Sequence, residues 1–100
     1  YLLVVEEDMV FAPDLLWYFA QLAPVLERDP SLWCISAWHD NAFSPYVGDP
    51  TVVMRTDWFS GLSWMMRIEI IRRELLLNWP ALGNWREWLR EVGSQRGLQC

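Results

Sequence analysis

YLLVVEED, residues 1–8, is a short apolar run that ends abruptly in three acids. A continuous apolar run of this kind is typical of a buried parallel strand. Open α/β sheets bind their ligands beyond the carboxyl ends of such strands. The stretch therefore predicts an α/β fold with a ligand site at residues 6–8.

The residues after this strand change to helical spacing. Asp14 favours the positive end of a helix, and apolar side chains then recur at positions 15, 19, 22 and 26. Asp29-Pro30 ends the helix, and residues 32–38 form a second apolar run rich in aromatic and β-branched side chains. Strand, helix and strand together predict a right-handed crossover unit.

The second half of the chain contains one loop, one strand and two helices by the same criteria. Residues 39–50 are rich in turn-forming side chains, which predicts a surface loop, and residues 51–54 are expected to form a third strand. A helix is expected over residues 64–77. The stretch 84–87, Asn-Trp-Arg-Glu, resembles a capping box that opens a final helix through residue 92.

Charge and hydropathy exclude two kinds of partner. The net charge is −5, with 13 acidic residues against 8 basic ones, and every basic residue is arginine. We therefore expect no nucleic-acid surface. No apolar run approaches the roughly 18 residues of a membrane-spanning helix, so no membrane contact is expected within this segment. Both ends have the pattern of a segment cut from a longer chain.

The two cysteines, Cys34 and Cys100, match no metal-ligand spacing. They are either free core thiols or one disulfide, and composition does not decide between these states. A disulfide closing so long a loop would contribute roughly 4 kcal/mol and would indicate an oxidising compartment.

Three consecutive acids at a strand end are costly unless a cation lies beside them. A divalent ion, Mn²⁺ or Mg²⁺, that bridges a diphosphate is the usual solution. The alternative is an acidic strand end with solvated side chains. Residues 6–8 are therefore a candidate metal site.

An ordered series of motifs extends this hypothesis. It includes residues 4–8, 12–14 and 29–38. The series resembles the family of N-acetylglucosaminyltransferase I and the protein O-mannose N-acetylglucosaminyltransferase, glycosyltransferase family 13. The resemblance covers essentially the whole chain, and its further matches are Asp40-Asn41, Arg55-Thr56-Asp57, Gly61-Leu62, Trp64, Trp79-Pro80, Trp85, Trp88, Arg90, Gln95-Arg96 and Cys100.

This resemblance implies a GT-A fold with a parallel-rich sheet and crossover helices. Residues 1–100 would be the metal-binding and acceptor-side portion of the catalytic domain. The implied reaction is an inverting transfer of GlcNAc from UDP-GlcNAc to a mannose hydroxyl of a protein-linked glycan. It implies Mn²⁺ as cofactor, with Mg²⁺ as the alternative, and the Golgi lumen as location. It also pairs Cys34 with Cys100, which would tie the second strand to the segment after the last helix.

The resemblance also assigns roles to single residues. The acidic triplet is the counterpart of the DXD motif, so that Asp8 would bind the metal while Glu6 and Glu7 would contact the sugar nucleotide or orient the site. Leu62, in a loop near the donor sugar, and Trp85, beside the acceptor site, would contact ligand.

The family's catalytic Asp is replaced by Arg86 in this chain. Arginine stays protonated and cannot accept a proton from the acceptor hydroxyl. Glu87 is the nearest carboxylate, but one residue on a helix is about 100° of rotation, and its other role is to cap Asn84. Four interpretations stay open: Glu87 is a displaced base, the start of this helix is remodelled, the site has lapsed into a nucleotide-sugar or glycan binding module, or the segment is structural and binds no ligand.

Further departures concern side chains around that site. Ser60 and Ser63 replace a Pro and a Gly of the family's loop, and Ser63 adds a side chain where glycine would let the backbone approach a ligand. Arg90 and Arg96 are expected to pair with Glu91 or solvent rather than with a diphosphate.

Overall fold

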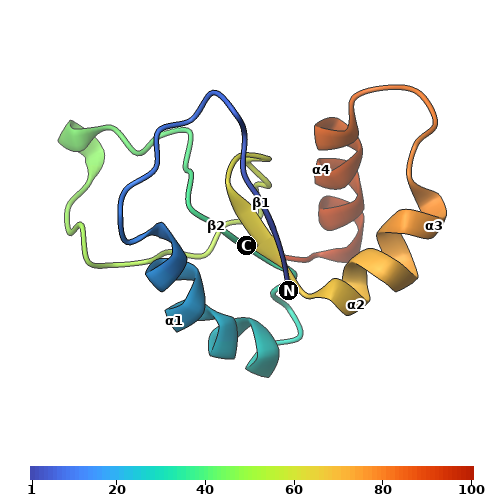
Figure 1. Ribbon diagram of the computed structural model, residues 1–100, viewed down its shortest axis with the longest axis horizontal. Coiled ribbons are helices and arrows are strands. Elements are labelled where there is room, and N and C mark those ends of the chain that lie inside the picture. Colours follow the sequence, from blue (N-terminus) through green and yellow to red (C-terminus); the bar gives the residue numbers. More distant parts are fainter.

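The computed structural model describes all of residues 1–100. It places a small three-stranded sheet between α1 on one side and the C-terminal helices on the other (Figure 1). The strands are β1 (Leu2–Val4), β2 (Cys34–Ser36) and β3 (Trp64–Met66). The helices are α1 (Leu15–Arg28), the 3₁₀ turn η1 (Ser44–Tyr46), the run of α2 (Ile68–Ile70), π-helical η2 (Ile71–Leu75) and α3 (Leu76–Asn78), and finally α4 (Trp85–Arg96).

The strand order is β1-β3-β2, and both outer strands pair antiparallel with β3. β1 and β2 therefore run in the same direction, as the strand-helix-strand pattern predicts, but β3 separates them. The expectation of a parallel neighbour for the first strand is wrong, because the later strand inserts between the two. A three-stranded sheet is too small to test the GT-A fold, which stays a prediction.

The third strand lies at a different place from the one predicted. Residues 51–54 contain no strand and are exposed, since no other strand lies beside them to pair with. Trp64–Met66, expected to begin a helix, instead forms the central strand, and all three residues are buried. Pairing on both edges and burial on both faces outweigh the favourable helix propensity of methionine. Helical structure begins at Ile68.

Side-chain alternation along β3 divides the core into two clusters. Met65, paired with Leu3 and Ile35, packs against α1 with the buried residues Phe19 and Leu26. Trp64 and Met66, on either side of Met65 in β3, point to the other face because side chains alternate along a strand. Their cluster contains the buried residues Trp33, Cys34, Phe59, Trp64, Met66, Ile71, Leu75 and Leu89.

α1 confirms the predicted amphipathic helix. Phe19 and Leu26 are buried, and Leu15 and Leu22 pack partly buried beside them. The helix ends at Arg28, directly before the Asp29-Pro30 pair expected to stop it.

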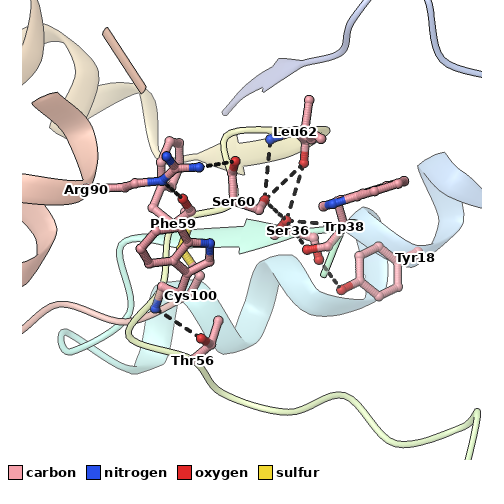
Figure 2. The surroundings of a disulfide bond; sticks show 11 residues. Tyr18, Ser36, Trp38, Thr56, Phe59, Ser60, Leu62, Arg90 and Cys100 are labelled. Carbon is pink, nitrogen blue, oxygen red and sulfur yellow. Dashed lines mark hydrogen bonds between the residues drawn. A yellow bond between two sulfur atoms is a disulfide. The ribbon is translucent and has the colours of Figure 1, made fainter. Parts of the chain in front are cut away.

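The disulfide Cys34–Cys100 is present and joins β2 to the segment after α4 (Figure 2). Its two Cα atoms lie 4.7 Å apart. Backbone pairing accompanies the bond: Cys100 exchanges two hydrogen bonds of 2.9 Å with Thr56, and the amide of Trp33 donates to the carbonyl of Gln99 at 3.0 Å. The C-terminal residues are therefore built into the core rather than trailing from it.

None of the helices combines the length and the apolar character needed to cross a membrane.

Candidate functional site

The loop that leads into β3, residues 59–63 (the β3 loop), is the centre of the polar network. Four of its five residues are buried, and Leu62 is half-buried. Two residues have left-handed backbone conformations, Gly61 with φ 76° and Ser63 with φ 45°. A non-glycine residue in this region is uncommon and marks a backbone held in place by its surroundings.

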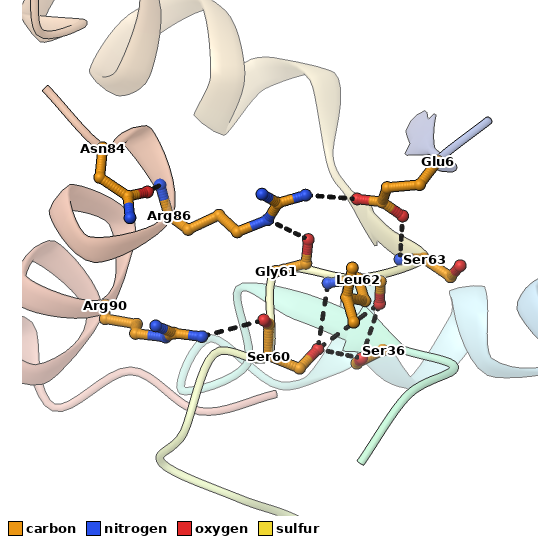
Figure 3. Close-up of polar contacts among 9 residues, drawn as sticks. All are labelled: Glu6, Ser36, Ser60, Gly61, Leu62, Ser63, Asn84, Arg86 and Arg90. Carbon is orange, nitrogen blue, oxygen red and sulfur yellow. Dashed lines mark hydrogen bonds and ion pairs between the residues drawn. The ribbon is translucent and has the colours of Figure 1, made fainter. Parts of the chain in front are cut away.

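Two arginines of α4 hold the backbone of this loop (Figure 3). Arg90 donates to the carbonyl oxygens of Phe59 at 2.8 Å and Ser60 at 3.1 Å. Arg86 donates from Nε to the next carbonyl, that of Gly61, at 3.1 Å. Because residues four apart share one face of a helix, α4 can satisfy three successive carbonyl groups at once.

Glu6 reaches the same loop from the end of β1 (Figure 3). Its Oε2 accepts a hydrogen bond from the amide of Ser63 at 3.1 Å, and its Oε1 lies 3.4 Å from Nη2 of Arg86. The Glu6 side chain is 14% exposed and that of Arg86 is 37% exposed. The carboxylate thus lies between a guanidinium and a backbone N–H.

Tryptophan rings flank both guanidinium groups. Cζ of Arg86 lies 4.7 Å from the ring centroid of Trp85, and Cζ of Arg90 lies 4.3 Å from that of Trp58. Stacked arginines of this kind gain cation–π attraction while their N–H groups remain free to donate in the ring plane. The rings therefore restrict the directions in which the two arginines point.

β2 supports the β3 loop from the opposite side (Figure 2). The hydroxyls of Ser36 and Ser60 lie 2.8 Å apart, and Leu62 donates its amide hydrogen to the Ser60 hydroxyl at 3.3 Å. Tyr18 of α1 donates its hydroxyl hydrogen to the carbonyl of Ser36 at 2.7 Å. Burial raises the pKa of Tyr18, which keeps this donor protonated.

The structure brings some predicted site residues together and leaves others apart. Glu6 and Leu62 belong to one network with Arg86, and Trp85 packs beside it. Glu87 lies on the first turn of α4 with an exposed side chain that makes no hydrogen bond. The predicted capping box is only half formed. Asn84 accepts a hydrogen bond from the amide of Arg86 at 3.0 Å, but Glu87 does not bind the amide of Asn84 in return.

Glu7 and Asp8 lie in the turn after β1, where both side chains are exposed and make no hydrogen bond or ion pair. No three histidine, cysteine, aspartate or glutamate side chains lie close enough to form a complete metal cage. Mg²⁺-type sites commonly use only one or two carboxylates together with substrate phosphates and water. Exposed carboxylate oxygens without protein partners fit that coordination, whereas Glu6 is already engaged.

Sequence reasoning missed the role of the arginines. Arg90 was expected to pair with Glu91 or solvent, but it binds loop carbonyls, and Arg96 forms an ion pair with Glu74. Arg86 was noted only as the loss of a carboxylate, yet it joins α4 to β1. The available signal was the spacing of four between Arg86 and Arg90, which places both on one helical face.

Comparison with known proteins connects this arrangement to a family. The model of the GNT-I family matches residues 1–100. The chain is also similar to the alpha-1,3-mannosyl-glycoprotein 2-beta-N-acetylglucosaminyltransferase of Arabidopsis thaliana, with 36% identity over 97 residues. That match covers 97% of this chain but only 21% of the relative, so the chain spans about a fifth of the relative's length.

Proposed function

The chain belongs to the GNT-I family, and on this premise we propose that it is part of a GT-A catalytic domain. The proposed reaction is an inverting transfer of GlcNAc from UDP-GlcNAc to a mannose hydroxyl of a protein-linked glycan. The 36% identity over 97 residues to a transferase of that printed activity carries the proposal. The disulfide supports a protein that matures in an oxidising compartment, which agrees with the Golgi lumen.

Asp8 is the residue we propose to hold Mn²⁺, or Mg²⁺ in its place, with Glu7 beside it. The ion would neutralise charge on the departing diphosphate. The support from the chain is the exposure of these carboxylates, which have no protein partner to displace.

Glu87 is the proposed base for the acceptor hydroxyl. Its carboxylate is exposed and makes no hydrogen bond, so it is free to accept a proton. Arg86 cannot serve, because it is a cation committed to Gly61 and Glu6. Trp85 and the β3 loop residue Leu62 would contact the sugars.

The test is GlcNAc transfer from UDP-GlcNAc to a mannose-terminated acceptor by the complete protein, with and without Mn²⁺. We expect transfer that falls at least a hundredfold in Asp8→Asn and in Glu87→Gln, since each variant removes a charged group used in the reaction. The exposed Glu91→Gln on the same helix is the control and should retain full activity. A folded native protein without transfer would refute the proposal.

A second candidate function is a binding module that keeps the ligand sites without turnover. The ion pair between Arg86 and Glu6 favours it, because this contact engages one of the three acids and places a cation at the start of α4. This function predicts Mn²⁺-dependent binding of UDP-GlcNAc by calorimetry with no transfer. Asp8→Asn should then abolish binding while Glu87→Gln leaves it unchanged.

A further inference from the structure

We propose that Arg86 and the backbone amide of Ser63 form a binding site for a phosphate or diphosphate group, and that the chain's own Glu6 carboxylate occupies this site as an internal competitor. The geometry in Figure 3 supports this assignment directly. An anionic group already lies between the two donors, with contacts of 3.1 Å to the amide and 3.4 Å to the guanidinium.

The donors have the chemistry of an oxyanion site. A guanidinium presents N–H groups in a planar fork that matches phosphate oxygens. The backbone amide of Ser63, a residue with φ 45°, supplies a second donor beside the guanidinium.

The site would stay formed after Glu6 leaves. The Nε atom of Arg86 remains bound to the carbonyl of Gly61, and the guanidinium remains stacked on Trp85. A Cβ atom built at Gly61 would lie 2.9 Å from Cδ of Arg86, so glycine is needed for the arginine to cross the loop. The guanidinium is therefore oriented by groups other than the carboxylate.

The contact with Glu6 leaves part of the donor capacity unused. Nη1 of Arg86 makes no hydrogen bond, and 37% of the side chain is exposed to solvent. The 3.4 Å separation from Glu6 is longer than the usual 2.7–2.9 Å of a charge-assisted hydrogen bond. A phosphate group with three oxygens can contact Nη1 and Nη2 of Arg86 together with the amide of Ser63, whereas Glu6 contacts only Nη2 and the amide.

The experiment measures binding of inorganic pyrophosphate to the complete protein by titration calorimetry, in EDTA so that no metal bridges the contact. We expect Glu6→Gln to bind pyrophosphate about tenfold more tightly than the native protein, because loss of the competing carboxylate raises the fraction of molecules whose site is open. Arg86→Gln introduced into Glu6→Gln should abolish the gain, and Arg86→Lys should recover only part of it.

Glu91→Gln is the matched control, because it removes the same charge from an exposed position on α4. An equal gain in Glu91→Gln would overturn the proposal, since it would show that net charge alone sets the affinity. No gain in Glu6→Gln with an unchanged circular dichroism spectrum would overturn it as well. Neither outcome bears on the proposed transfer reaction, because no sugar or metal takes part.

Discussion

Two loops of this protein lie in opposite environments. Residues 39–55 (the outer loop) are exposed at every position, whereas the β3 loop is almost entirely buried. The outer loop contains mainly short-range contacts, such as the two hydrogen bonds from Thr51 to Asp49. The β3 loop contacts Glu6, Arg86 and Arg90, which are 25 to 57 positions away. Composition identifies a loop, but only distant partners decide whether it is rigid enough to form a site.

The largest expected effect on stability comes from loss of the disulfide. Removing it with Cys34→Ala and Cys100→Ala together should lower the free energy of unfolding by roughly 4 kcal/mol, because the unfolded chain is no longer restricted by a closed loop. Denaturant unfolding of the oxidised native protein and the double variant measures this. A change below roughly 1 kcal/mol would show that the disulfide adds little to the backbone pairing between Cys100 and Thr56.

A glycine-to-alanine substitution in each loop tests the same comparison, with an expected effect on stability of intermediate size. Gly61→Ala should destabilise the protein by about 2 kcal/mol, because φ is positive and Arg86 lies in the way. Gly48→Ala in the outer loop meets nothing within 4 Å and should stay within about 0.5 kcal/mol of the native protein. Thermal unfolding of both variants is the measurement, and equal losses would contradict the contrast.

The smallest effect is the pH dependence inside the outer loop. Hydrogen bonds from the hydroxyl and amide of Thr51 hold the pKa of Asp49 below its ordinary value of 3.8. A lowered carboxyl pKa stabilises the folded state above pH 3.8, and this contribution is lost as the pH falls through the folded value. NMR titration of Thr51→Ala should show the pKa of Asp49 rising toward 3.8. An unchanged titration would mean that the turn does not persist in solution.

The sequence correctly predicted the elements that depend on residues close to one another in the chain. The spacing of Phe19 and Leu26 identified the buried face of α1, and Asn84 marked the residue before α4. The family resemblance, not the spacing, paired Cys34 with Cys100. These features depend on neighbours within a few turns or on a shared motif.

The elements that were missed depend on partners distant in sequence. Met65 forms a strand because β1 and β2 lie on either side of it, and no local pattern records that arrangement. The contact between Arg86 and Glu6 spans 80 positions. The sequence therefore revealed that Arg86 replaces a carboxylate, but not that Glu6 is the partner of this arginine. The roles of Asp8 and Glu87 remain predictions for the transfer assays.

The disulfide also sets an order of events during synthesis. Cys34 leaves the ribosome 66 residues before its partner, which at 5–20 residues per second is an interval of roughly 3 to 13 s. Throughout that time Trp33 and the thiol beside it lack the C-terminal segment that covers them. Folding of this region therefore waits for residue 100, and a pause in translation before Cys100 would lengthen the period in which Cys34 is open to a wrong partner.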